Sequence, residues 1–175
     1  IIILCKMFKG DNMDGIILIN KPSGMTSHDV VNKLRKILKT KKVGHCGTLD
    51  PDATGVLVVC VNKATIVLQF LTSDSKEYIA TLFLGTSTDT YDASGKVLEK
   101  KEYSSLDKQV IIDCFNNFVG KQIQKPPIYS AIKVNGKKLY EYARNGEEVE
   151  IPTREVEINY LEIMDIKDNL IKFKV

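Results

Sequence analysis

The sequence predicts an α+β domain, in which a mixed and largely antiparallel sheet is flanked by helices. Short apolar runs bounded by turn residues indicate strands, and they occur in irregular order with segments of helical period. The Asn135-Gly136 pair is typical of the tight turn of a β-hairpin. A chain of 175 residues with 43% hydrophobic residues is long enough for one core but not comfortably for two, so we expect a single compact domain.

Two strands and two helices are predicted in the first half of the chain. The strands are GIILINKP at 15–22 and VLVVCV at 56–61, and the helices are TSHDVVNKLRKILK at 26–39 and a short segment at about 62–71. We expect Ser27 to cap the longer helix, with the acidic Asp29 in its first turn. The apolar residues of this helix recur on one face, and its basic residues fall on the opposite face.

The second half of the chain is predicted to contain further strands and helices. These are a strand at 78–84, a turn-rich loop at 86–95, a helix at 104–120, a short helix at 139–146, and strands at 154–166 and 170–175. Ser104 and Asp107 stand at the spacing of a capping box at the start of the longer helix. Its inward face is predicted to consist of Val110, Ile111, Cys114, Phe115 and Phe118.

Charge and composition narrow the class of protein. The net charge is only +3, but the segment KLRKILKTKK at 33–42 holds six cations and no acid, which is typical of a protein with a polyanionic partner. An ordinary solvated helix face is an equally good interpretation of such a run. No apolar run approaches the roughly 18 residues of a membrane span, and no signal peptide is recognisable. The cysteines have no CxxC spacing, so we expect neither disulfides nor a zinc site, and we expect a cytoplasmic protein.

The segment VGHCGTLDPDATGVLVV at 43–59 places a histidine and two aspartates among glycines, just before an apolar run. Residues 50–54 match the D-x-D-x-T pattern of magnesium-dependent haloacid-dehalogenase-type phosphatases, but that pattern should follow an apolar strand rather than precede one. Zinc binding by His45 and Cys46 lacks further ligands. The residues alone leave two interpretations of Asp50, a lone reactive carboxylate or a plain turn residue.

This segment resembles the GHxGTLDPxATGVL signature of the TruB family of pseudouridine synthases. Three further segments resemble motifs of that family in the same order: DGIILINKPSGMTSHDVV, SKEYIATLFLGTSTDTYDASG and KPPIYSAIKVNGKKLYEYARNG. The resemblance implies a pseudouridine-synthase core over residues 13–175, with an RNA-gripping insertion at about 124–152. Residues 1–12 precede the usual start of the family, and we expect them to be disordered.

The resemblance also implies a reaction, the isomerisation of uridine to pseudouridine at position 55, in the T loop of transfer RNA, without cofactor or metal. Asp50 aligns with the catalytic aspartate of the family, and we expect its carboxylate to attack either C1′ of the ribose or C6 of the base. Tyr78 aligns with the tyrosine that faces the extruded base, and His45 aligns with a histidine close to that nucleotide. The expected partner is the T stem-loop of transfer RNA, bound by a monomer.

Cationic side chains are expected to contact RNA phosphates, which gives affinity without reading bases. The candidates are Lys33, Lys36, Lys39, Lys41, Lys42, Lys133 and Arg144. Lys21 aligns with a Lys-Pro motif of the family, for which we expect a structural role. Cys46 stands where the family commonly has threonine or another small residue, a change we expect to be tolerated.

Family members carry a later motif, similar to S-K-G-T-Y-I-R, whose arginine pairs with the catalytic aspartate, and a C-terminal RNA-binding domain usually follows. The sequence printed here contains neither, so we expect weak or no catalysis from these residues alone. One alternative is therefore a fragment that binds transfer RNA without forming product. The others are the phosphatase, which a chelator would inactivate, and the guide-RNA-dependent branch of the same family, which works in a multiprotein particle on ribosomal RNA.

Overall fold

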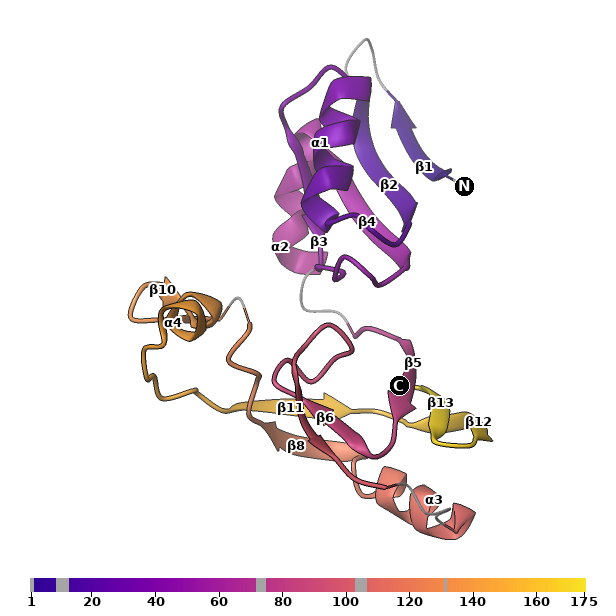
Figure 1. Cartoon of the computed structure of the whole chain (residues 1–175). Helices are drawn as coiled ribbons and strands as arrows, with labels where there is room; N and C mark the ends of the chain where they lie inside the picture. The colour runs from indigo at the N-terminus through magenta and orange to yellow at the C-terminus, as the bar shows by residue number, and fades with distance from the viewer. Residues whose placement is uncertain (1, 9–12, 72–74, 103–106, 131) are drawn as a thin grey trace. The chain divides into compact units, whose positions relative to one another are not determined.

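The computed structural model describes residues 2–8, 13–71, 75–102, 107–130 and 132–175 (Figure 1). The chain forms two compact units, Ile1–Lys76 and Glu77–Val175. This differs from the single domain expected from the sequence, because each unit builds strand ladders of its own and no described strand of one pairs with a strand of the other. Among the described residues, no helix combines the length and hydropathy needed to cross a membrane.

Unit 1 is built on a four-stranded antiparallel sheet. In the order β1-β2-β4-β3, its strands are β1 (Ile2–Phe8), β2 (Met13–Lys21), β4 (Gly55–Val61) and β3 (Val43–Cys46). β4 runs into a 3₁₀ helix η1 (Asn62–Val67) and a short helix α2 (Leu68–Leu71). The register pairs Lys21 with Gly55 and Cys46 with Val58. The end of β2 and the loop at 47–54 therefore meet at the same end of the sheet.

The core of unit 1 lies between this sheet and the helix α1 (Ser27–Ile37), which Figure 1 shows packed across it. Its buried apolar residues are Ile17, Val30, Val31, Leu34, Val43, Leu57, Val59 and Val61. Burial of each such side chain stabilises the fold by about 1.5–3 kcal/mol. Leu49 packs against this cluster from the loop at 47–54, so the core also holds the middle of that loop.

The start of α1 corrects one expectation. Thr26, rather than Ser27, is the N-cap: its hydroxyl accepts the Asp29 N–H at 3.1 Å, and the Asp29 carboxylate accepts the Thr26 N–H at 2.9 Å. This reciprocal pair is a capping box, which satisfies two backbone donors at the start of the helix. Ser27 is instead the first helical residue and is buried.

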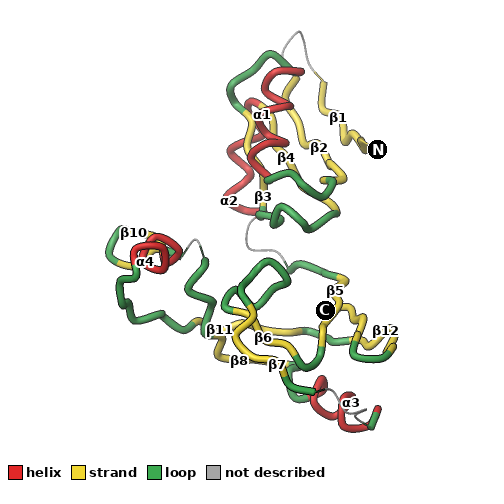
Figure 2. The backbone as a smooth tube through the Cα atoms, in the orientation of Figure 1, coloured by secondary structure: helices red, strands yellow, loops and turns green. Residues whose placement is uncertain are grey.

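The described residues of unit 2 form short antiparallel ladders and two helices (Figure 2). Three strands form a sheet in the order β12 (Glu162–Lys167), β13 (Leu170–Lys174) and β5 (Ile79–Phe83). Three further pairs are β6 (Thr86–Thr88) with β7 (Val97–Lys100), β8 (Gly120–Gln124) with β11 (Arg154–Ile158), and β9 (Lys133–Val134) with β10 (Lys137–Lys138). The helices are α3 (Lys108–Asn116) and α4 (Leu139–Asn145). The α+β class is confirmed, and every pairing between described strands is antiparallel.

The helix α3 is shorter than the sequence predicted. Its N-cap is Asp107, whose side chain accepts the Gln109 N–H at 2.9 Å, whereas Ser104 lies outside the described residues. Of the five side chains expected inward, only Ile111 is buried, and Phe115 lies edge-on to Phe173 with ring centroids 5.3 Å apart. Val110, Cys114 and Phe118 are exposed.

Two other segments differ from expectation. The segment predicted as a loop at 86–95 begins with β6, since Thr86 and Ser87 pair with Lys100 and Glu99. Residues 2–8, expected to be disordered, form β1, in which Ile2 pairs with Ile19. This pairing satisfies the backbone groups along the edge of β2. The Asn135-Gly136 hairpin is confirmed, with φ of 51° and 81° at its two turn residues.

Candidate active site

Asp50 stands in the loop between β3 and β4, where its side chain is exposed. The loop closes a turn at this point, since the Ala53 N–H donates to the Asp50 carbonyl oxygen at 3.1 Å. Within the described part of the chain, no hydrogen bond or ion pair engages the Asp50 carboxylate. The backbone of this residue is fixed while its carboxylate stays free to meet a ligand.

Lys21 holds the loop at 47–54 through hydrogen bonds to backbone carbonyl oxygens. Its side chain is 0% exposed, and its ammonium donates to the carbonyl oxygens of Pro22 at 3.0 Å, Met25 at 2.7 Å and Pro51 at 3.1 Å. All three ammonium donors are therefore satisfied by backbone acceptors. Pro51 also accepts the Gly24 N–H at 2.9 Å, so the turn after β2 and the turn at Asp50 are joined. The structural role expected for Lys21 is confirmed.

Ser27 holds the same loop through hydrogen bonds to Leu49. Its hydroxyl donates to the Leu49 carbonyl oxygen at 3.1 Å and accepts the Leu49 N–H at 3.0 Å. Leu49 immediately precedes Asp50, so both backbone groups beside the candidate nucleophile are held by one buried side chain. Sequence reasoning missed this role, because it depends on a contact between positions 22 residues apart.

His45 lies at the end of β3, where its Nδ1 is 2.6 Å from the Gly47 carbonyl oxygen. Because a carbonyl oxygen only accepts, this contact places the proton on Nδ1 and leaves Nε2 of the neutral ring as an acceptor. The geometry requires Gly47 to adopt a φ of 78°, which is strained for any residue with a Cβ. His45 and Asp50 thus belong to one loop region of unit 1.

Tyr78 belongs to unit 2, at the start of β5. Its N–H donates to the Val175 carbonyl oxygen at 2.8 Å, and its own carbonyl oxygen accepts the Val175 N–H at 3.0 Å. Tyr78 is 43% exposed, so its side chain is accessible to a ligand. These bonds extend the β5–β13 ladder by one pair and fix the backbone from which the ring projects.

A charged cluster next to Tyr78 was not predicted. The Tyr160 hydroxyl donates to the Glu77 carboxylate, and the Lys174 ammonium lies 3.0 Å from the same oxygen. The Tyr160 hydrogen bond, followed by that of Lys174, lowers the pKa of Glu77 from its usual range. The bond to Glu77 raises the pKa of Tyr160 and of Lys174. The cluster ties the start of β5 to the end of β13.

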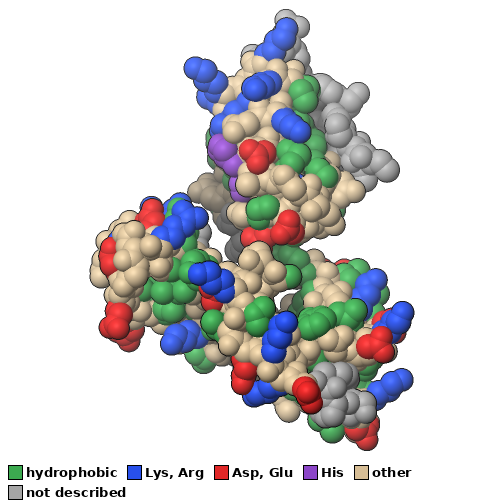
Figure 3. Space-filling view, in the orientation of Figure 1, with side chains coloured by type: hydrophobic (Ala, Val, Ile, Leu, Met, Phe, Trp, Pro, Cys, Tyr) green, Lys and Arg blue, Asp and Glu red, His purple; other side chains and the backbone are tan. Residues whose placement is uncertain are grey.

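The candidate RNA-binding cations are all exposed. In unit 1 they are Lys33, Lys36, Lys39, Lys41 and Lys42, and Figure 3 shows cationic side chains in blue over the α1 side of this unit. In unit 2 they are Lys133 and Arg144. The nearby Arg35, which is outside the candidate set, donates to the Val43 carbonyl oxygen at 3.1 Å and so has a structural role.

The α4 segment combines cations with aromatic rings. The Lys137 ammonium lies 4.6 Å from the Tyr142 ring centroid, and the Tyr140 ring has Lys138 at 5.3 Å and Arg144 at 5.2 Å. Among the described residues, no group of three or more His, Cys, Asp or Glu side chains is placed to hold a metal ion.

Comparison with known proteins identifies the family. Residues 35–175 match the model described as TruB family pseudouridylate synthase (N terminal domain), and the chain belongs to this family. It is 52% identical over 157 residues to the tRNA pseudouridine synthase B of Bacillus cytotoxicus, and 54% identical over 147 residues to that of Bacillus subtilis. These matches cover 89% and 83% of this chain but 51% and 48% of the relatives. The chain therefore spans about half the length of the curated relatives it matches.

Solved structures agree on the fold. A Cbf5-Nop10-Gar1 complex contains a chain that superimposes with a TM-score of 0.64 at 32% identity, over 90% of this chain and 38% of the other. An H/ACA ribonucleoprotein bound to a substrate RNA containing 2′-deoxyuridine gives a TM-score of 0.61 at 30% identity, over 90% of this chain and 36% of the other. The pseudouridine-synthase fold expected from the sequence is thereby confirmed.

Proposed function

We propose that this chain is the N-terminal, aspartate-bearing part of an enzyme that isomerises uridine to pseudouridine at position 55, in the T loop of transfer RNA. The observation that carries the proposal is Asp50, a carboxylate without a partner among the described residues, on a loop fixed by Lys21 and Ser27. Fixing the backbone while leaving the reactive group free is the arrangement that a nucleophile needs. Family membership supplies the reaction class.

In the proposed reaction, Asp50 acts as the nucleophile. Its carboxylate attacks C1′ of the ribose or C6 of the base, the C1′–N1 bond breaks, and the base turns and rejoins C1′ through C5. The bond between the carboxylate and C1′ or C6 then breaks, which returns Asp50 to its free form. The proton leaves C5 and a proton is gained at N1, so neither redox chemistry nor hydrolysis occurs. We assign no metal or cofactor to this reaction.

His45 and Tyr78 are proposed to hold the extruded uridine. With its proton on Nδ1, the His45 ring offers Nε2 as an acceptor to the rearranged loop of the RNA. Tyr78 offers a half-exposed ring, and bases that leave a helical stack are held against such faces. The two residues belong to different units of the chain.

The exposed cations are proposed to bind the phosphate backbone. The lysines on and after α1 are exposed in unit 1, and Lys133 and Arg144 lie within the segment 124–152, which we assign as the RNA-gripping insertion. In this segment, lysine and arginine lie over tyrosine rings, an arrangement suited to both phosphate contact and base stacking. A monomer in the cytoplasm stays a prediction.

The test is conversion of a T-arm stem-loop RNA in the presence of a chelator, scored as pseudouridine. The chain is assayed alone and extended by the remaining half of the Bacillus subtilis relative, each as parent, Asp50→Asn and Asp52→Asn. Asp52 is the matched control, because it is exposed on the same loop. We expect Asp50→Asn to lower conversion at least about a thousandfold with unchanged RNA binding, and Asp52→Asn to stay within about threefold of the parent.

The outcomes separate the candidate functions. Product from the extended chain but not from the chain alone means that this part binds RNA and needs its continuation for turnover. Equal losses in Asp50→Asn and Asp52→Asn contradict the assignment of Asp50 as nucleophile. The family match gives the phosphatase no support, and loss of activity in chelator is the result that would restore it.

The ribonucleoprotein branch of the family is the second candidate. It is favoured by the superposition on the chain of the Cbf5 complex, at 32% identity. Identity of more than 50% to several tRNA pseudouridine synthase B proteins supports the stand-alone reaction instead. Conversion of the bare T-arm RNA without any guide RNA distinguishes the two.

A further inference from the structure

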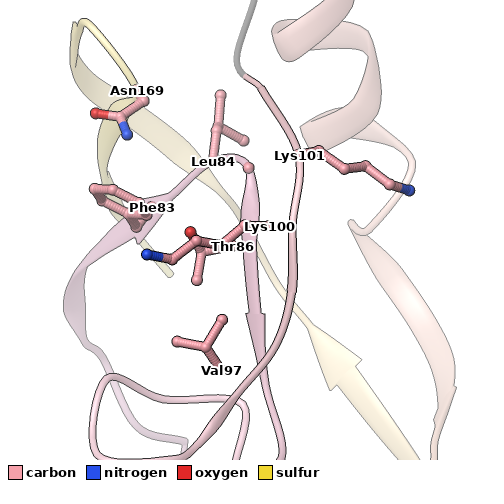
Figure 4. A pocket seen from close by; sticks show the side chains of 8 residues that line it. Phe83, Leu84, Thr86, Val97, Lys100, Lys101 and Asn169 are labelled. Carbon is pink, nitrogen blue, oxygen red and sulfur yellow. The ribbon is translucent and has the colours of Figure 1, made fainter.

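A concave site lies wholly within unit 2, and none of the residues assigned above lines it. It is a cavity of about 440 Å³ between the end of β5, the β6–β7 hairpin and the turn between β12 and β13 (Figure 4). The volume falls within the roughly 300–1,000 Å³ typical of small-molecule sites. Its lining combines the apolar Phe83 and Val97 with the polar Thr86 and Asn169 and with two lysines, Lys100 and Lys101.

Backbone hydrogen bonds hold the walls of this cavity together. The Leu84 N–H donates to the Asn169 carbonyl oxygen at 2.8 Å, which joins the end of β5 to the β12–β13 turn. The Lys101 N–H donates to the Gly85 carbonyl oxygen at 2.8 Å, which closes the β6–β7 hairpin against the β5–β6 turn. Three segments distant in sequence therefore form one fixed wall.

A β-bulge places an apolar side chain on the same wall as the lysine. Thr86 pairs with Lys100 and Ser87 with Glu99, but Thr88 pairs with Val97, so Leu98 is the extra residue. Without the bulge, Val97 would face the side opposite to Lys100, because side chains alternate along a strand. Bulges are used to re-aim side chains near functional sites. Here the bulge brings Val97 to the face of Thr86 and Lys100.

The charge of the cavity suits an anion. No lining residue is acidic. Within the described residues, Lys100 has no carboxylate partner, whereas Lys101 is 3.3 Å from Glu99. Figure 4 shows the Lys100 side chain extending alongside Thr86, and the Lys101 side chain directed away from it. Lys100 is therefore the cation available to a ligand in the cavity.

We propose that this cavity binds one unpaired nucleotide of an RNA, with the base against Phe83 and the phosphate at Lys100. Phe83 is 51% exposed, so its ring is accessible for stacking. Base stacking on an aromatic ring accepts any base, and a lysine beside it holds the backbone. The Asn169 amide and the Thr86 hydroxyl can each donate and accept, as the edge of a base requires. An anionic ligand with a purely alkyl body would leave these polar groups without partners.

The choice of RNA, rather than a free nucleotide, rests on the proposed function. The two are distinguished by the probes, which are uridine 5′-monophosphate, uridine, inorganic phosphate and a four-residue oligouridylate. Binding is followed by NMR of the backbone amides around the cavity, in the chain with Asp50→Asn, so that no turnover occurs. Failure to form pseudouridine therefore does not affect this measurement, and failure of this measurement leaves the Asp50 reaction intact.

The variants are Lys100→Gln and Phe83→Leu, with Lys101→Gln as the matched control. Phe83→Leu keeps an apolar side chain and removes the stacking face, so the wall is retained. We expect both to weaken the oligouridylate by about tenfold, which corresponds to about 1.4 kcal/mol and lies within the usual value of one stacked base. Lys101→Gln is expected to change its affinity by less than about twofold.

Several results would overturn the proposal. Equal losses in Lys100→Gln and Lys101→Gln would mean general charge attraction instead of a site. Inorganic phosphate binding as tightly as the monophosphate would mean an anion site that ignores the base. Binding of the monophosphate without the oligouridylate would exclude RNA as the source. Unchanged affinity in Phe83→Leu, in a variant whose amide spectrum shows it folded, would remove the stacking role.

Discussion

The Ser27 hydroxyl holds both backbone groups of Leu49, donating to its carbonyl oxygen at 3.1 Å and accepting its N–H at 3.0 Å. Ser27 is 2% exposed, and Asp50 follows Leu49 directly. The start of α1 is thereby coupled to the residue proposed as nucleophile. A helix in the core of unit 1, rather than the loop itself, fixes where Asp50 lies.

Ser27→Ala is expected to destabilise unit 1 by about 1–2 kcal/mol, because both backbone groups of the partly buried Leu49 lose their partner. Thr26→Ala is the control: it removes the N-cap, costs about 1 kcal/mol, and leaves the Leu49 contacts in place. Hydrogen exchange of the Leu49 amide should accelerate strongly in Ser27→Ala and little in Thr26→Ala. Pseudouridine formation by the extended chain should fall in the first variant only. Equal acceleration in both variants would contradict the coupling.

Lys21→Met is expected to be more damaging than any surface substitution in unit 1. It removes three hydrogen bonds to carbonyl oxygens at a position that is 0% exposed, and we expect a loss of about 3 kcal/mol in the free energy of unfolding. Lys63→Met is the control, since Lys63 is 88% exposed and lies 3.9 Å from Asp14, a pair worth less than about 1 kcal/mol. Urea unfolding measures both. A loss below about 1 kcal/mol in Lys21→Met would show that the three contacts do not bear on stability.

The exposed lysines of unit 1 are expected to bind RNA only through electrostatic contacts with its phosphates. Lys41→Gln should weaken T-arm RNA binding and reduce the slope of log affinity against log salt by about one unit, because each phosphate contact releases about one counterion. The same variant should leave the preference among RNA sequences unchanged, since phosphate contacts carry no base information. Lys63→Gln is the control within the same unit and outside the candidate set. An unchanged salt slope in Lys41→Gln would assign this lysine to the solvated surface instead.

The fold of unit 1 could be predicted where local periodicity and packing agree. The patterns at 15–22, 26–39 and 56–61 correspond to β2, α1 and β4, which surround the core. β3 was not predicted, because the glycines beside His45 make a strand indistinguishable from a turn. The pairing of β3 with β4 depends on tertiary contacts, which the local sequence does not indicate.

Only some residues of the candidate site could be predicted, again because the local sequence does not indicate tertiary contacts. Asp50, His45 and Tyr78 were found because their motifs resemble a family, whereas the residues alone left Asp50 as either a reactive carboxylate or a turn residue. Glu77 and Tyr160 went unnoticed, because 83 residues separate them and neither forms part of a periodic pattern. The inward face predicted for α3 was largely wrong, since amphipathic spacing gives the apolar stripe of a helix but not how much of it a sheet covers.

The Glu77 cluster gives unit 2 a defined pH dependence. The pKa of Glu77 is lowered below its ordinary value of 4.5, so its contribution to stability is present above that value and is lost as the pH falls through the lowered pKa. The pKa values of Tyr160 and Lys174 are raised above 10.0 and 10.5, so their contributions are lost as the pH rises through those raised values. The cluster is therefore intact between about pH 4.5 and 10.

Tyr160→Phe tests this cluster, because it removes the hydrogen bond that contributes most to the pKa shift of Glu77. We expect the titration midpoint of the Glu77 carboxyl, measured by carbon NMR, to move up toward its ordinary value in Tyr160→Phe. In Lys174→Gln, the midpoint of the same carboxyl should move up by less. Tyr129→Phe is the control, since Tyr129 is similarly exposed and is not among the causes of the Glu77 shift. Because Glu77 precedes Tyr78, exchange of the Tyr78 amide should quicken in Tyr160→Phe. An unmoved Glu77 midpoint would mean that the Tyr160 hydroxyl does not engage this carboxylate in solution.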